Sequence, residues 1–178
     1  MVRTIAQNVF DSGAHVIIAL TCVGVSHDFE RHHLVNRDML YYARTAFSNQ
    51  IKLKQEVTLI DQQGLCQMTE SVLTNTNAGQ DHRRAWIASC FSNEYQREGN
   101  TRWRSKVNPE WLRQSIKSLH QWISATGYPL RIAIQYMDGC MDERDWDQVL
   151  SVLNEYLLSY DVLICEGLIL PPHLCGRH

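Results

Sequence analysis

The sequence has no long apolar run, no internal repeat and no low-complexity segment. Nowhere do about 18 consecutive apolar residues occur, the length that a membrane-spanning helix needs, so we expect no such helix. The most apolar stretch, residues 15–25, is shorter than that and follows Asp11. Because a basic segment and a small-residue cleavage site are also missing, we expect no signal peptide.

The motifs of nucleotide-binding proteins, hydrolases and metalloenzymes are missing too. The sequence contains no P-loop, no GxGxxG, no GxSxG and no HExxH, so it singles out no catalytic residue, cofactor or metal site. The six cysteines are irregularly spaced and include no CxxC pair. Such cysteines are typical of the core of a protein in a reducing compartment. We therefore expect an intracellular protein, cytoplasmic or nuclear.

Little net charge remains when acids and bases are counted. The 19 Asp and Glu residues against 17 Lys and Arg residues leave a net charge of -2. This balance excludes a globally basic nucleic-acid binder, although it leaves room for a local basic patch. Hydrophobic residues make up 44% of the 178 residues, which suits one globular domain, or a small domain with a helical extension.

Hydrophobic spacing predicts strands and helices in alternation. Short apolar or alternating runs predict strands at 15–25, 30–35, 56–60 and 161–170. Residues recurring at helical spacing predict helices that begin near Asn36, Gly64, Asn108 and Asp142. The third of these has the clearest ends, because Asn108 can cap it, Pro109 suits its first position and Gly127 can end it.

Residues 34–74 contain the most informative pattern. They include LVNRDMLYYARTAF at 34–47, EVTLID at 56–61 and LCQMTESVL at 65–73. This succession of a short strand, a helix, a strand and a helix resembles a BTB/POZ domain of the divergent fungal type over residues 13–75. A weaker echo follows at 119–140, where SATGYPLRIAI resembles the helix-turn-helix of the same family.

The resemblance implies an α+β domain with a small mixed sheet, flanked by helical hairpins and followed by a C-terminal helical extension. Residues 1–75 would form the BTB-like part, 76–107 a variable basic-aromatic insertion, 108–170 the helical part and 171–178 a tail. The implied function is an adaptor-like protein-interaction module that forms a homodimer and recruits another protein. Its contact residues would be Leu34, Met39, Leu40, Tyr41 and Tyr42.

The segment 81–106 suggests nucleic acid as a partner in place of another protein. It combines arginines with aromatic residues, and arginine can neutralise phosphates while aromatic rings stack on unpaired bases. The candidate nucleic-acid contacts are Arg83, Arg84, Trp86, Arg102, Trp103 and Arg104. The simpler interpretation is a half-buried amphipathic helix, because several apolar residues between 86 and 95 fall at helical spacing.

The last alternative is a small intracellular α/β enzyme or nucleic-acid-acting protein. Five acids lie between positions 138 and 147, and such a cluster suits Mg²⁺, although a helix cap with a solvated face explains it more simply. The histidines at 27–33 and the Cys and His residues of the tail match no metal motif. Residues 130–136 separate the two hypotheses, because the BTB resemblance implies a helix there and the enzyme alternative implies a strand.

Overall fold

Seven strands and two helices form the part of the chain that the structure, a computed structural model, describes: residues 1–23, 63–73, 83–98, 102–128, 130–136 and 142–167. In chain order they are β1 (Val2–Ile5), β2 (Val16–Cys22), β3 (Cys66–Leu73), β4 (Arg83–Glu98), β5 (Arg102–Val107), α5 (Pro109–Thr126), β6 (Arg131–Gln135), α6 (Glu143–Leu157) and β7 (Asp161–Cys165).

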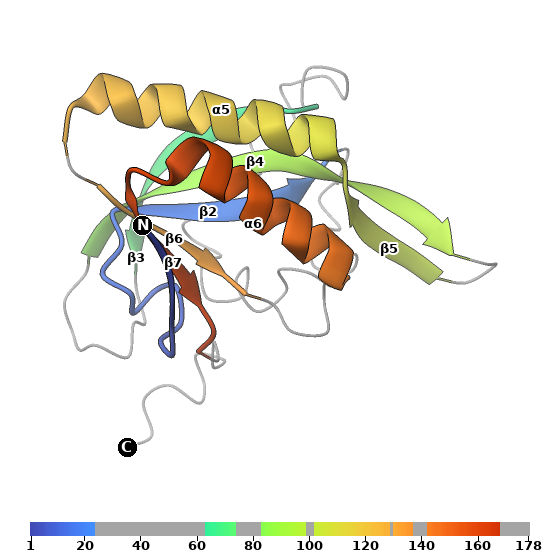
Figure 1. Cartoon of the computed structure of the whole chain (residues 1–178), viewed down its shortest axis with the longest axis horizontal. Coiled ribbons are helices and arrows are strands. Elements are labelled where there is room, and N and C mark those ends of the chain that lie inside the picture. The colour runs from blue at the N-terminus through green and yellow to red at the C-terminus, as the bar shows by residue number, and fades with distance from the viewer. Residues whose placement is uncertain (24–62, 74–82, 99–101, 129, 137–141, 168–178) are drawn as a thin grey trace.

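The strands form one mixed, mostly parallel sheet in the order β1-β7-β6-β2-β4-β3. β1, β7, β6, β2 and β4 run parallel, whereas β3 runs antiparallel to β4. β5 pairs antiparallel with the far half of β4, so these two strands extend as a hairpin beyond the end of β2 (Figure 1). The predicted parts 1–75, 76–107 and 108–170 all contribute strands to this sheet.

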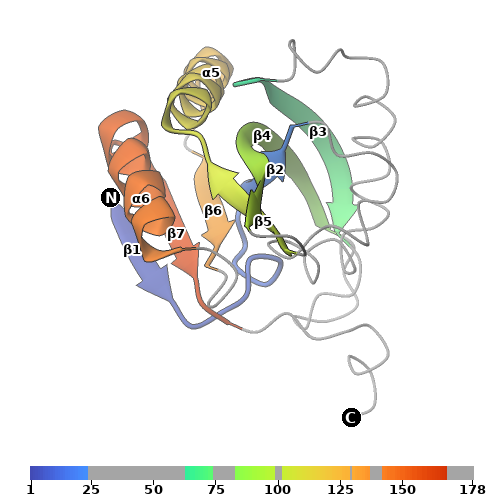
Figure 2. The same cartoon turned by 90° about the vertical axis from the view of Figure 1, so that its right-hand side faces the viewer.

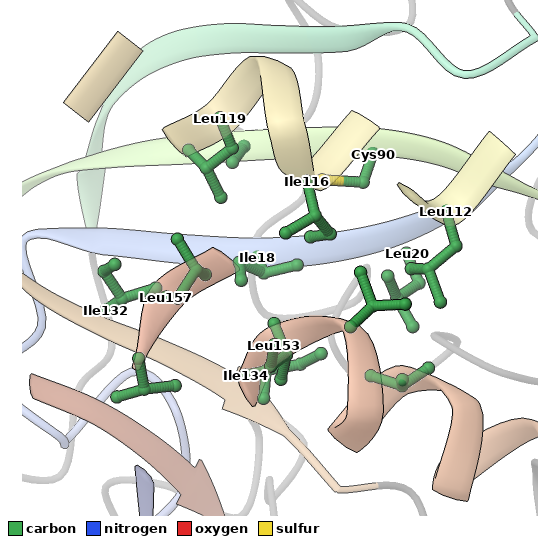
Figure 3. Packing of buried hydrophobic residues seen from close by; sticks show 14 of the residues in the cluster. Ile18, Leu20, Cys90, Leu112, Ile116, Leu119, Ile132, Ile134, Leu153 and Leu157 are labelled. Atoms are coloured by element: carbon green, nitrogen blue, oxygen red, sulfur yellow. The ribbon is translucent and has the colours of Figure 1, made fainter. Parts of the chain in front are cut away.

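Both described helices lie side by side on one face of the sheet, as Figures 1 and 2 show. The core beneath them is built from alternate residues of the parallel strands, because successive side chains of a strand point to opposite faces. Figure 3 shows Ile18 of β2 and Ile134 of β6 facing Ile116 of α5 and Leu153 of α6. These four side chains are at most 2% exposed.

The opposite face of the sheet has a separate apolar cluster. Ile17 and Ala19 of β2 join Ala133 of β6 there, and the connection between β1 and β2 packs on them through Val9 and Phe10. All five side chains are buried. The connection is thereby held against the sheet and cannot act as a free surface loop.

The best-defined sequence predictions are confirmed. The strand predicted at 15–25 is β2, and the helix predicted from Asn108 is α5. The Asn108 side chain accepts hydrogen bonds from the amides of Glu110 and Trp111, and Gly127 ends the helix at φ 67°. This left-handed conformation suits a residue without a Cβ. Asp142 caps α6 as predicted, by accepting from the Arg144 amide.

Two helix predictions are wrong. Residues 65–73, predicted as a helix after Gly64, contain strand β3, and the amphipathic helix suggested for 86–95 is part of the 16-residue strand β4. The two strands pair over eight registered positions, from Cys66 with Cys90 to Leu73 with Arg83. Each segment therefore satisfies its backbone hydrogen bonds through its neighbour, and this long-range pairing overrides the local spacing.

Residues 131–135 form the strand β6, which overturns the helix that the BTB/POZ resemblance implied there. Ile132 pairs with Val16 on one side and with Val162 on the other. A strand with neighbours on both edges and helices above it needs an apolar run, and RIAIQ supplies one. The α+β class is confirmed at the coarse level, whereas the small sheet between helical hairpins is wrong. The predicted strands at 30–35 and 56–60 and the helix after Asn36 lie outside the described residues.

Asp161 holds two arginines at the amino edge of the sheet, where the parallel strands begin. Its carboxylate lies 2.8 Å from Nε of Arg131 and 3.3 Å from Nε of Arg3, so it joins β7 to both neighbouring strands. The hydrogen bond from Arg131 and then the one from Arg3 hold the pKa of Asp161 below its usual value of 3.8. These bonds favour the charged form of the carboxyl group.

We expect Asp161→Asn to lower stability at neutral pH by about 1 kcal/mol or less, because the ion pairs are partly exposed and screened by water. A depressed pKa contributes stability that is present above the unfolded pKa and is lost as the pH falls through the folded pKa. The difference in melting temperature between wild type and variant should therefore shrink below pH 3.8. Asp147→Asn, at an exposed position of α6, is the control. A difference that persists undiminished at acid pH would contradict this account.

Candidate functional site

The chain changes direction within the sheet between β2 and β6. It leaves β2 toward β3 and β4, but it leaves the neighbouring strand β6 toward β7 on the other side. In open α/β sheets, ligands bind outside the carboxyl ends of the strands at such a switch point. The candidate site is therefore the carboxyl edge, defined as the ends of β1, β7, β6 and β2 together with residues 6–12.

A tight polar turn begins this edge. The Asn8 side-chain oxygen accepts hydrogen bonds from the amides of Phe10 (2.9 Å) and Asp11 (3.0 Å), and its amide group donates to the Asp11 carboxylate at 2.5 Å. The Ser12 hydroxyl donates to the Val9 carbonyl at 2.6 Å. Asn8 and Ser12 are both buried. Asparagine suits this place because its short side chain can bond to the backbone two and three residues further on.

Gln135, the last residue of β6, clamps three segments together. Its side-chain oxygen accepts from the Val9 amide at 2.9 Å, while its amide group donates to the carbonyls of Gly167 (3.0 Å) and Tyr136 (3.1 Å). The side chain is 7% exposed. One neutral amide thus satisfies one backbone donor and two backbone acceptors inside the fold, which a charged or apolar side chain cannot do.

The end of β7 completes the edge by direct backbone contact with β1 and the turn after it. The Glu166 amide donates to the Ile5 carbonyl at 3.0 Å, and the Gly167 amide donates to the Gln7 carbonyl at 3.1 Å. A Cβ added to Gly167 would lie 2.4 Å from the Asn8 nitrogen. Glycine is required here because the two backbones approach too closely for any side chain.

The chemistry of the described edge is that of binding more than of nucleophilic attack. Burial raises the pKa of Cys165, at the end of β7, to about 12. Its thiol therefore stays protonated and unreactive at neutral pH. Tyr136 follows β6 and meets Trp146 of α6 edge to face, with ring centroids 4.9 Å apart. The edge thus offers backbone groups, neutral amides and an aromatic pair.

Of the five acids at 138–147, the four from Asp142 onward are described and belong to the start of α6, the element that follows β6 in the chain. Asp142 is used as the cap of α6. Asp145 is buried, and its carboxylate accepts from the Val107 amide at 3.1 Å, which joins α6 to the end of β5. Among the described residues, no group of three or more His, Cys, Asp or Glu side chains is placed to hold a metal ion. Asp142 therefore fits the predicted helix cap, whereas Asp145 is buried and does not belong to the solvated face that was expected.

The basic-aromatic residues do not lie together. Arg83, Arg84 and Trp86 begin β4, whereas residues 102–104 pair with Glu98, Arg97 and Gln96 at its far end. Gln96 follows Arg84 by twelve positions along the strand, or about 40 Å at about 3.3 Å per residue. Trp86 also packs edge to face on Trp122 of α5 at 5.0 Å, which gives it a structural role. Nucleic-acid binding stays a prediction, and its candidate residues now form two separate groups, one at each end of β4.

The predicted protein-contact residues Leu34, Met39, Leu40, Tyr41 and Tyr42 lie outside the described residues. Self-association therefore stays a prediction. Neither helix in the described part of the chain is long and apolar enough to cross a membrane.

The comparisons with known proteins find a structural likeness and no sequence relative. No protein-family model matches the chain, and no curated protein matches it at a significant level. The chain is similar in structure to the macrodomain of Mycobacterium tuberculosis DarG, with a TM-score of 0.54 and 16% identity over 94% of this chain and 99% of that one. A shared fold is what this likeness shows.

Two further macrodomain structures match at a TM-score of 0.49 each. One is the macrodomain of Thermus aquaticus DarG, with 14% identity over 94% of this chain and 99% of that chain. The other is a macrodomain protein from Streptomyces coelicolor, with 10% identity over 93% of this chain and 99% of that chain.

The likeness to the Mycobacterium tuberculosis DarG macrodomain, together with the strand β6, overturns the BTB/POZ resemblance and the adaptor-like interaction module that it implied. The quoted segments at 56–61 and 34–47 are not described. Residues 65–73 contain β3, the last strand of the sheet formed by the described residues, and the echo at 119–140 contains the strand β6. A short apolar segment can fit the residue spacing of a helix and of a strand equally well. Whether it becomes a strand depends on the segments with which it pairs in the fold.

Asn8, Ser12, Gln135 and Gly167 were not identified from the sequence. A weak signal existed at the first of them, because Asn8 and Asp11 stand between two apolar segments, as turn residues do. Nothing local marks Gln135, since its partners lie 126 and 32 residues away in the chain.

Proposed function

We propose that this chain binds an ADP-ribose unit at its carboxyl edge. Macrodomain structures suggest ADP-ribose binding or hydrolysis, and the observation that carries the proposal is the likeness to the Mycobacterium tuberculosis DarG macrodomain over almost the whole chain. Hydrolysis of an ADP-ribosyl bond would need this binding step first. The small α/β enzyme considered from the sequence is therefore closer to the proposal than the interaction module is.

The organisation of the edge supports this function. ADP-ribose is an extended ligand with a base, two riboses and a diphosphate, and such ligands are oriented by a few fixed polar groups and backbone amides. Here the turn at Asn8, the end of β6 and the end of β7 are tied together by hydrogen bonds to Gln135, of which the one from Val9 is buried. A binding edge held in this way loses little conformational freedom when the ligand arrives.

Titration of the full chain with ADP-ribose in a calorimeter tests the proposal. We expect one site with a Kd in the micromolar range, equivalent to about -8 kcal/mol. Asn8→Ala should weaken binding about tenfold, or about 1.4 kcal/mol, because the amides of Phe10 and Asp11 lose their shared acceptor and the turn loosens.

Asn154→Ala is the matched control, since Asn154 is exposed on α6, where its side-chain amide donates to the Leu150 carbonyl of the same helix. It should leave the Kd unchanged. The absence of binding heat and of any thermal shift with millimolar ADP-ribose would refute the function. Normal binding by Asn8→Ala would instead place the ligand away from this edge.

A further inference from the structure

Three sulfur atoms meet between β3 and β4, away from the carboxyl-edge turn. Sγ of Cys90 lies 4.0 Å from Sγ of Cys66, which in turn lies 3.8 Å from Sδ of Met68. Cys66 and Cys90 stand directly opposite each other in the antiparallel register. Both belong to the face under α5, where Figure 3 shows Cys90 beside Ile116.

The backbone around the two cysteines suits a covalent bridge. The Phe91 amide donates to the Leu65 carbonyl at 2.9 Å, so the pair next to the cysteines is hydrogen-bonded. Because the two kinds of pair alternate along an antiparallel ladder, Cys66 and Cys90 form a non-hydrogen-bonded pair, in which the Cα atoms lie about 4.5 Å apart. That spacing falls within the range of disulfides, about 4.4–6.8 Å.

We propose that Cys66 and Cys90 are a redox site, which hydrogen peroxide converts to a cross-strand disulfide and which thiols reduce again. The Cys66 thiolate attacks one peroxide oxygen, the O–O bond breaks, and Cys66 becomes a sulfenic acid while the released hydroxide takes up a proton as water. The Cys90 sulfur then attacks the Cys66 sulfur and gives up its proton. The S–S bond forms, the S–O bond breaks, and the leaving hydroxide takes that proton as a second water.

The different exposure of the two thiols sets the order of these steps. Cys90 is fully buried, whereas Cys66 is half-buried in β3, so an oxidant reaches Cys66 first. The hydrogen bond with Cys66 and then burial raise the pKa of Cys90 well above its usual value. Cys90 therefore stays a thiol until its neighbour has been oxidised, and it lies at the right place to resolve the sulfenic acid before further oxidation.

The bridge would tie β3 to β4 beneath α5. β3 has β4 as its sheet neighbour in the described residues, and a covalent tie to it restricts the opening of this edge. The oxidised protein should therefore melt at a higher temperature than the reduced protein, and the amides of β3 should exchange more slowly with deuterium.

Peptide mapping of the full chain tests the site directly. Reduced wild-type protein is treated with stoichiometric hydrogen peroxide, its free thiols are alkylated after unfolding, and the non-reduced digest is analysed by mass spectrometry. We expect a pair of peptides linked through Cys66 and Cys90. Its mass should be two hydrogen atoms below the summed masses of the two free-thiol peptides, and dithiothreitol should separate the pair. This readout needs no variant and does not depend on ADP-ribose binding.

Two variants sharpen the result. Cys165→Ser replaces a buried cysteine on β7 and should leave the linked pair at the wild-type yield. Cys66→Ser should abolish it and leave Cys90 as an alkylatable thiol. The proposal is overturned if wild-type Cys66 accumulates as sulfinic acid without a link, if it pairs with another cysteine, or if oxidation leaves the melting temperature unchanged.

Discussion

Replacing Gln135 with leucine should lower the free energy of unfolding by about 3 kcal/mol or more. The side chain binds the Val9 amide and the carbonyls of Tyr136 and Gly167. Leucine has nearly the same size but leaves all three groups without this partner, and an unsatisfied buried polar group costs about 1–3 kcal/mol. Chemical denaturation followed by circular dichroism measures the difference, provided that the slope of the transition is unchanged.

Gln121→Leu is the matched control for this substitution. Gln121 is exposed on α5, so the same chemical change there should alter stability by no more than about 0.5 kcal/mol. Because the clamp also positions the turn at Asn8, Gln135→Leu should weaken ADP-ribose binding if the proposed function is right. Equal stabilities of the two variants would show that the clamp contributes nothing.

The second large effect is expected for Gly167→Ala. Its Cβ would lie 2.4 Å from both the Asn8 nitrogen and the Gln7 carbonyl carbon, and 2.5 Å from the Ala6 carbonyl oxygen. These three contacts are with backbone atoms, which cannot rotate away as a flexible side chain can. The end of β7 must therefore move away from the turn after β1 to relieve the clash. We expect a loss of about 3 kcal/mol, the upper part of the range for overpacking.

Gly127→Ala separates this clash from the ordinary cost of replacing a glycine. Gly127 has φ +67° and no atom within 4 Å of an added Cβ, so alanine there meets only the left-handed backbone penalty, about 1 kcal/mol. Denaturation of both variants measures the two costs. A Gly167→Ala protein no less stable than Gly127→Ala would contradict the close approach of the two segments.

Part of the fold could be predicted from the sequence, because the residues that determine it are neighbours in the chain. Asn108, Pro109 and Gly127 mark both ends of α5, and Asp142 marks the start of α6, since a cap needs only neighbouring amides. The strand β2 was accessible for a similar reason, because a β-branched apolar run in one stretch predicts a buried strand.

The signals failed where local spacing was ambiguous. Leu65 and Met68 have the spacing of a helical stripe, yet Met68 lies in strand β3 and pairs with Ala88 of β4. Residues 130–136 fit both a helix and a strand, and the position of β6 between β2 and β7 decides for the strand. A family resemblance based on such windows inherits the same ambiguity, which explains why the BTB/POZ interpretation was wrong.

By itself, the sequence determined both ends of α5, the start of α6 and the strand β2, because each depends on residues close together in the chain. Its composition also suits a globular domain. Only the tertiary structure decided the sheet order and the contents of the candidate site. Gln135 binds Val9 across 126 positions, and Cys66 meets Cys90 across 24. Such contacts have no local signal, since they exist only once strand pairing, parallel at the carboxyl edge and antiparallel between β3 and β4, has brought distant segments together.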